Sequence, residues 1–275
     1  MDDRLRQIQL LELEALTELR AFCKKHNIDF FLRGGSVMGA VKYHGFVPWD
    51  DDADIAVPRQ QYNRLIELTN KYEWSQKFYI LSYKYNPEIH CYFPRVLLKE
   101  EIRKQMGLPS NNKLGLTLID ILPIDGTPNS FLARSIYYFK VYLYRALAGV
   151  WTVDIKETVD MHDTKKRIIL KILKKLGIAR FYKQTDIYDK LDKLYSKHSI
   201  ENSKYIGTIT GSLYRKEILK KEYWGNGVEM KFENQSFLVP QNYDEYLKQL
   251  YGKNYMTVTP SLKQQHAKQH IKSST

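Results

Sequence analysis

Two aspartates at the start of a short apolar segment are the residues of this sequence best suited to chemistry. Asp52 and Asp54 lie in the run DDADIAVP, whose last residues are typical of a buried strand. Side chains two positions apart in a strand point to one face, so we expect Asp52 and Asp54 to lie side by side and Asp51 to point away. Adjacent carboxylates repel each other unless a cation neutralises them. Carboxylate ligands with no His or Cys among them favour Mg²⁺ or Mn²⁺ over Zn²⁺.

A third carboxylate, Asp120, lies within the apolar run GLTLIDIL at residues 115–122. An aspartate inside a buried strand is costly unless it is paired, hydrogen-bonded or bound to a metal. The plain alternatives are a solvated acidic turn at residues 50–54 and a hydrogen-bonded structural aspartate at position 120. The metal site is favoured because the acidic cluster continues into an apolar strand and stands out in a basic protein.

A glycine–serine turn, Gly34-Gly35-Ser36, separates an expected strand at residues 28–32 from a helical pattern at residues 37–43. Glycines allow a close approach of the backbone to a ligand, and the N–H groups at a helix start attract anions. Ser36 is also suited to capping the following helix. Taken alone, the motif is more typical of a turn with a capping serine than of a phosphate site.

The net charge of +12 in 275 residues predicts an anionic partner: a nucleotide, a nucleic acid or an acidic membrane face. The two cysteines, Cys23 and Cys91, form no CxxC pair, so the sequence predicts neither a zinc ligand set nor a disulfide framework. The N-terminal residues lack the unbroken apolar stretch of a signal peptide, and no window is long enough to span a bilayer. We expect a cytoplasmic protein, with peripheral contact at the inner face of the membrane as an option.

The order of predicted elements indicates a mixed α/β (α+β) fold, with a mixed sheet flanked by helices. We expect a catalytic core at residues 1–127 and a mainly helical extension at residues 128–275 that completes the substrate site. Strands are predicted at residues 28–32, 52–57, 77–83, 91–99, 115–122 and 237–239. Helices are predicted at residues 5–26, 37–43, 60–72, 130–151 and 243–251, with two more in 160–198, separated by Gly177.

The glycine–serine turn, the helix, the DxD strand and the third aspartate together resemble the scheme of the nucleotidyltransferase fold. The stretch FLRGGSVMGAVKYHGFVPWDDDADIAVPR is more specific and resembles the LicD family, whose signature is approximately GGTLLGAxRHxGFIPWDDDxDxxxxR. The segments LTLIDILPIDG and VPQNYDEYLKQLYGKNYM resemble that family's third-carboxylate block and C-terminal block. The family also includes relatives of fukutin.

The resemblance implies transfer of a phospho-alcohol from a CDP-linked donor to a sugar hydroxyl, with release of CMP. The acceptor would be a cell-surface glycan, such as a teichoic acid, capsule or lipopolysaccharide, or its lipid-linked precursor. We favour phosphocholine from CDP-choline; phosphoribitol and phosphoglycerol from their CDP-alcohols are alternatives. By position, Asp52, Asp54 and Asp120 would be catalytic and hold Mg²⁺ or Mn²⁺, with Asp120 also a candidate base.

Contacts to the donor phosphates are predicted at the glycine–serine turn and at three basic residues: Gly34, Gly35, Ser36, Lys42, Arg59 and Arg95. Arg59 matches the arginine that follows the strand in the family pattern. Lys42-Tyr43 stand where the family usually has Arg-His, which weakens the case for a bidentate phosphate contact there. For Arg95, a surface arginine is an equally good interpretation.

The aromatic segment at residues 130–151 has two interpretations. It is a core helix, or it lies on an anionic membrane face with Arg134, Lys140 and Arg145 directed toward headgroups, assisted by the lysine-rich residues 160–198. The core helix is the favoured interpretation.

Three other functions are weaker. A nucleic-acid binder is disfavoured, and no nucleic-acid partner is expected, because the basic residues are spread along helices and the acidic triplet would repel phosphates. A nucleotidyltransferase acting on a small substrate would lack the GFVPWDDD segment. A catalytically dead scaffold is disfavoured because all three carboxylates are present.

Overall fold

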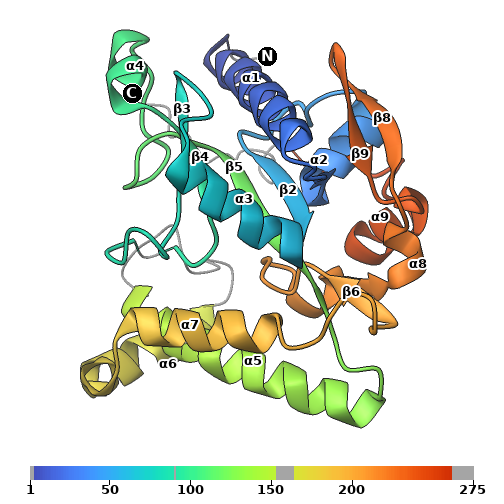
Figure 1. The fold of residues 1–275 in the computed structure, drawn as a ribbon. Coiled ribbons are helices and arrows are strands. Elements are labelled where there is room, and N and C mark those ends of the chain that lie inside the picture. Colours follow the sequence, from blue (N-terminus) through green and yellow to red (C-terminus); the bar gives the residue numbers. More distant parts are fainter. Residues whose placement is uncertain (1–2, 90, 153–163, 262–275) are drawn as a thin grey trace.

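The structure is a computed structural model that describes residues 3–89, 91–152 and 164–261. A mixed sheet lies at its centre, with strand order β3-β4-β5-β2-β1-β9-β8 (Figure 1). The pairs β2/β5 and β1/β9 are parallel and the other neighbours are antiparallel. The strands are β1 Phe31–Leu32, β2 Ala53–Pro58, β3 Phe78–Leu81, β4 Arg95–Leu98, β5 Thr117–Gly126, β8 Val228–Phe232 and β9 Gln235–Val239. The predicted α+β class is confirmed.

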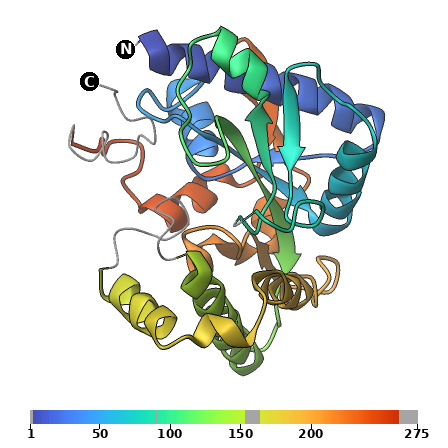
Figure 2. The same ribbon diagram turned by 90° about the vertical axis from the view of Figure 1, so that its left-hand side faces the viewer.

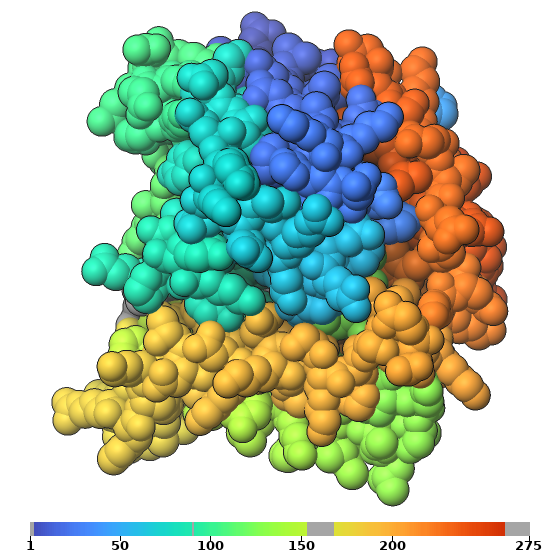
Figure 3. Space-filling view, viewed as in Figure 1, coloured from blue at the N-terminus to red at the C-terminus, as the bar shows by residue number. Residues whose placement is uncertain are grey.

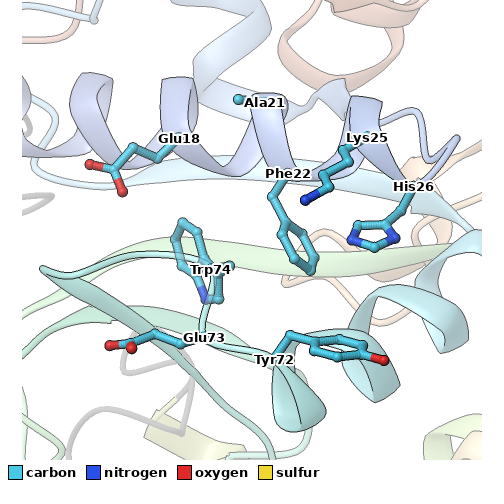
Figure 4. A pocket seen from close by; sticks show the side chains of 8 residues that line it. All are labelled: Glu18, Ala21, Phe22, Lys25, His26, Tyr72, Glu73 and Trp74. Carbon is cyan, nitrogen blue, oxygen red and sulfur yellow. The ribbon is translucent and has the colours of Figure 1, made fainter.

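Helices α1 (Asp3–Lys25) and α3 (Arg59–Lys71) pack against the sheet. The apolar stripe of α1, which includes Leu11, Leu16 and Leu19, is buried, because its side chains recur at helical spacing and face β5. The last turns of α1 and the chain after α3 border a shallow groove of about 570 Å³ lined by Phe22 and Trp74 (Figure 4). None of the predicted site residues lines this groove.

The glycine–serine turn begins a short helix, α2 (Gly34–Met38), which continues as a π-helical turn, η1 (Gly39–Tyr43). Gly39 is required here because a Cβ at this position would lie 2.4 Å from the backbone oxygen of Gly45. This close approach folds residues 44–49 back over the turn. The acidic residues that follow therefore return to the sheet beside α2.

Strand β5 is longer than its sequence indicated. We expected it to end at Pro123, but it continues to Gly126 and stays in parallel register with β2, where Val57 pairs with Pro123. Strand β4 accompanies β5 only as far as Asp120, so from there one side of β5 is open until β6 (Tyr205–Gly207) joins at Asp125. A proline is tolerated on the open side of a strand because no ladder hydrogen bond is lost.

The second half of the chain adds a helical layer below the sheet (Figures 1 and 2). Helices α5 (Phe131–Thr152) and α7 (Gln184–Tyr195) pack together through a tyrosine-rich cluster, and α6 (Thr164–Lys175) packs against α5. The remaining elements are α4 Glu100–Gln105, η2 Ile178–Phe181, η3 Tyr214–Glu217, β7 Ile218–Lys220, α8 Lys221–Trp224 and α9 Tyr243–Tyr251.

The chain after residue 128 also completes the central sheet, since β9 pairs with β1 and β8 pairs with β9. The segments 1–127 and 128–275 therefore share one sheet, and their division at residue 127 stays a prediction. Within the described part of the chain, no helix is both long and apolar enough to cross a membrane.

Candidate active site

Asp54 and Asp120 face each other across the two parallel strands at the centre of the sheet. Asp54 on β2 is in register with Asp120 on β5, and neighbouring strands lie about 4.8 Å apart. Asp52 precedes β2, which begins at Ala53 and not at Asp52 as expected. The pKa of Arg95 is raised above its usual value. Burial lowers this pKa, but nearby groups, among them the carboxylates of Asp120 and Asp52, raise it by more. Asp52 is thus near enough to act on the same arginine as Asp120.

Each facing carboxylate forms an ion pair with one arginine. Arg33 Nη1 lies 3.0 Å from Asp54 Oδ1, and Arg95 Nε lies 2.9 Å from Asp120 Oδ1. The side chains of Asp54 and Asp120 are 24% and 17% exposed, so both remain within reach of solvent and of a ligand. The two aspartates are therefore partly buried, paired with arginines and accessible, which is the environment expected of a reactive group.

The Asp54 carboxylate is held in an unfavourable electrostatic position. Burial raises its pKa to about 7; the charge of Arg33 opposes this rise and the charge of Asp120 adds to it. Ionisation of Asp54 is thus costly in the protein alone, although an arginine is already in contact. A cation between the two aspartates would offset both the burial and the repulsion.

Arg33, which the sequence analysis did not single out, is anchored from behind. Its Nε donates to Glu217 Oε2 at 3.1 Å and to Thr208 Oγ1 at 3.2 Å, and its Nη2 forms an ion pair with Glu217. Arg33 and Glu217 are both buried. A buried guanidinium needs such partners, so Glu217 fixes the orientation in which Arg33 meets Asp54. The sequence signal for Arg33 was a charged residue directly after the apolar residues FFL, at the end of an expected strand. No sequence pattern marks Glu217 as its partner.

The glycine–serine turn lies against these carboxylates. Ser36 Oγ accepts a hydrogen bond from the Asp54 N–H at 2.9 Å, so Ser36 joins the turn to β2. It does not cap α2, whose N-cap residue is Arg33. The Gly34 N–H donates to the hydroxyl of Tyr246 on α9 at 2.8 Å. The C-terminal block thus supports the turn, and a Cβ at Gly35 would lie 2.8 Å from Asp50 Oδ2.

We expect Gly34→Ala to reduce activity while costing only modest stability. Gly34 has a left-handed φ of +53°, and an added Cβ would lie 3.3 Å from Asp54 Oδ2. The strain of about 1 kcal/mol follows from the backbone conformation, and displacement of Asp54 should lower kcat about tenfold or more. Gly107→Ala is the matched control, because Gly107 has φ +65° and no heavy atom within 4 Å of the added Cβ. Equal activity of the two variants would contradict this placement.

Two of the predicted phosphate contacts, Arg59 and Lys42, are bonded to other parts of the chain. Arg59 begins α3 at the far end of β2, where its Nε and Nη2 each donate to Asp125 at 2.6 Å. Arg59 comes five positions after Asp54, roughly 16 Å along a strand. Lys42 Nζ donates to the carbonyl oxygen of Val258 at 3.0 Å. The structure thus brings the turn, Asp54, Asp120 and Arg95 together. Arg59 lies at the far end of β2, and Lys42 contacts the chain after α9.

Glu12 is a further carboxylate that sequence analysis missed. It lies on the buried face of α1, is 0% exposed, and neither oxygen has a hydrogen-bond partner among the described residues. Burial raises its pKa well above the usual range, and the charges of Asp52, Asp51 and Asp50 raise it further. Burial and the neighbouring aspartates thus both favour the neutral form of the Glu12 side chain beside the acidic turn. The sequence signal for a buried Glu12 was its position among the apolar residues of the first helix.

The donor set fits a magnesium ion that also binds a substrate phosphate. In the described part of the chain, no group of three or more His, Cys, Asp or Glu side chains is arranged to hold a metal. Mg²⁺ in phosphate-transferring enzymes is typically bound through one or two carboxylates plus the phosphates. Asp54 and Asp120 supply two adjacent carboxylates, and Asp52 lies at the start of the same strand.

Comparison with known proteins finds two similar sequences and one matching family model. The family model described as "LicD/FKTN/FKRP, nucleotidyltransferase domain" matches residues 27–100. The lipopolysaccharide cholinephosphotransferase LicD of Haemophilus influenzae is 28% identical over 264 residues, which cover 93% of this chain and 92% of that protein. An uncharacterized protein of Rickettsia prowazekii is 33% identical over 60 residues, 22% of each chain. The family model and the near-full-length relative thus both support the resemblance of this chain to the LicD family.

Proposed function

We propose that this chain is a phosphotransferase that moves phosphocholine from CDP-choline to a sugar hydroxyl of a surface glycan or its lipid-linked precursor. The observation that carries the proposal is the in-register pair Asp54–Asp120 beside the glycine–serine turn. The donor and acceptor classes are supported by similarity to the H. influenzae cholinephosphotransferase, which spans nearly the whole chain. Release of CMP and dependence on a divalent cation are part of the proposal.

Phosphoryl transfer asks a protein mainly to position the reactants and to stabilise charge. Mg²⁺ or Mn²⁺ held by Asp54 and Asp120, with Asp52 adjacent, would supply neutralisation of the donor diphosphate. Arg33, fixed by Glu217, keeps the Asp54 carboxylate directed at the site. Arg95 holds the Asp120 carboxylate in the same way through its ion pair. Among the predicted basic contacts Lys42, Arg59 and Arg95, it is Arg95 that pairs with one of the two facing aspartates.

The attacking sugar hydroxyl must lose a proton as the new phosphate ester bond forms. Asp120 is our candidate base, because its side chain is partly exposed and its strand position faces Asp54. The bond from phosphorus to the CMP oxygen breaks as the ester forms, and CMP leaves with the negative charge. Asp120 therefore has two alternative roles, as a cation ligand or as a base.

The direct test incubates the purified protein with Mg²⁺, a glycan acceptor and one CDP-alcohol at a time: CDP-choline, CDP-ribitol, CDP-glycerol or CDP-ethanolamine. We expect CMP release to require the acceptor, to stop with EDTA, and to be at least about tenfold faster with CDP-choline than with the other donors, as for a pocket that reads one alcohol. A faster rate with CDP-ribitol or CDP-glycerol would assign that alcohol in its place. No release with any donor would contradict the proposed transfer.

A further inference from the structure

The helical layer leaves a large apolar surface without a partner in the described structure. We define the α5–α6 face as the exposed apolar side chains of α5, α6 and η2. On α5 they are Phe131, Leu132, Ile136, Phe139, Tyr142 and Leu143. On α6, η2 and the turn between them they are Ile168, Ile169, Ile172, Leu176 and Phe181.

This face is unusual in its degree of exposure. Phe181 is 86% exposed, Phe131 79% and Leu132 71%. Among the described residues, the five most exposed large apolar side chains all belong to this face. Single apolar side chains are common on protein surfaces, but so many on two packed helices mark an interaction site.

The apolar side chains of α5 are not explained by its packing in the core. Tyr137, Val141 and Ala148 point to the buried side of the helix and join the cluster shared with α7. With 3.6 residues per turn, Leu132, Phe139 and Leu143 lie on the opposite side and are exposed. Helix α5 is thus apolar on both sides, and only one side has a partner in the described structure. The core interpretation accounts for one side alone.

The charged residues of the elements that form the face are all basic, since α5, α6 and η2 contain no aspartate or glutamate. Residues 130–152 contain no acidic residue, and residues 164–183 contain none while carrying eight lysines and arginines. Lys140, Lys171 and Lys175 are exposed beside the apolar side chains, as are Arg180 and Lys183 near Phe181. In Figures 1 and 2, α5 and α6 form the end of the molecule away from α1, and the space-filling view shows the same end as its lower rim (Figure 3).

Two of the three cations expected to face a membrane do not. Arg145 donates to the carbonyl oxygens of residues 209–211, the shortest at 2.9 Å to Ile209, and is directed into the protein. Arg134 lies over the ring of Tyr205 at 4.1 Å. Of the three, Lys140 is exposed. The cations beside the apolar face come mainly from α6 and the turn after it.

We propose that the α5–α6 face docks on an anionic lipid bilayer. Helices that lie in a bilayer interface combine exposed Phe, Leu and Ile side chains with Lys and Arg directed to the headgroups, which is the composition of this face. Negative lipid headgroups attract such cations within a Debye length. Two copies of this chain joined through this face would instead bring two purely basic segments together, which like-charge repulsion opposes.

The test measures binding of the full chain to vesicles by sedimentation. We expect at least about tenfold more bound protein on vesicles with 30% phosphatidylglycerol than on pure phosphatidylcholine, and loss of most binding in 0.5 M salt, as for an electrostatically assisted interface. Binding that is equal on both vesicle types, or that does not respond to salt, would overturn the proposal.

Substitutions on the α5–α6 face test whether this surface is the one that binds the vesicles. Phe131→Ser combined with Phe139→Ser, and separately Lys171→Glu combined with Lys175→Glu, should each reduce binding to anionic vesicles at least about tenfold. These side chains are exposed, so the melting temperature should stay unchanged. The matched charge control is Lys24→Glu with Lys25→Glu at the end of α1, which should keep binding. Equal loss in this control would overturn the assignment, as would a dimer in solution that the Phe131/Phe139 variant dissociates while vesicle binding is absent.

Discussion

We expect Asp54→Asn to remove transfer activity while the fold is retained. Asparagine has the shape of aspartate but no charge, so the variant loses half of the facing carboxylate pair that we propose to hold the divalent cation. Removal of one such electrostatic contact lowers kcat about a hundredfold to a thousandfold. CMP release from CDP-choline in the presence of acceptor measures the effect. Asp186→Asn, an exposed aspartate on α7, is the control and should keep full activity.

The same variant should not lose stability at neutral pH. Because the pKa of Asp54 is raised to about 7 in the folded protein, this state binds a proton more tightly than the unfolded state. Stability of the metal-free protein therefore falls as the pH rises from about 4 toward 7, and Asp54→Asn avoids this loss. In EDTA we expect its melting temperature to equal or exceed that of the unmodified chain at pH 8, and the difference to vanish near pH 4. Near-normal turnover by Asp54→Asn would contradict its role.

Asp125→Asn should have the opposite profile, with a large loss of stability and little loss of activity. Asp125 is fully buried and accepts two hydrogen bonds from Arg59, at 2.6 Å each. Removing one charge of a buried ion pair costs about 3–5 kcal/mol, which lowers the melting temperature by roughly 6 °C or more in a protein of this size. Thermal unfolding followed by circular dichroism measures the loss.

Activity measured at a temperature where Asp125→Asn remains folded should stay within about twofold of normal, because its strand position lies roughly 16 Å from Asp120. Asp192→Asn serves as the comparison: it removes the second carboxylate that contacts Arg59, but Asp192 is 21% exposed, so its loss should cost less. If Asp125→Asn abolished transfer without destabilising the chain, Arg59 would belong to the donor site, as its position in the family pattern implied.

The sequence predicted the elements that combine a strong pattern with local signals. The α1 stripe, the β2 and β5 apolar runs and the helix after Pro58 all lie within a few residues of their predicted places. Their side chains repeat at one clear period, and their ends carry glycine, proline or polar residues. The register of Asp54 with Asp120 follows once β2 and β5 are neighbours, although nothing local in the sequence states that they pair.

What the sequence could not supply are contacts between distant segments. Glu217 meets Arg33, and Tyr246 meets the Gly34 N–H, across more than 180 residues. The orientation of Arg59 was missed for a related reason. The family pattern indicates that an arginine follows β2, but its partner Asp125 lies at the end of a strand that Pro123 was expected to stop. The β8–β9 hairpin joins the sheet through β1, a pairing that its own sequence does not reveal.

The most direct test of the proposed site is the position of the cation itself. Crystals of the protein grown with CDP-choline and Mn²⁺ can be measured at a wavelength where manganese scatters anomalously. We predict an anomalous peak coordinated by the carboxylates of Asp54 and Asp120 and by a donor phosphate oxygen. A donor bound without any peak between these two aspartates, or a peak held by other residues, would contradict the account.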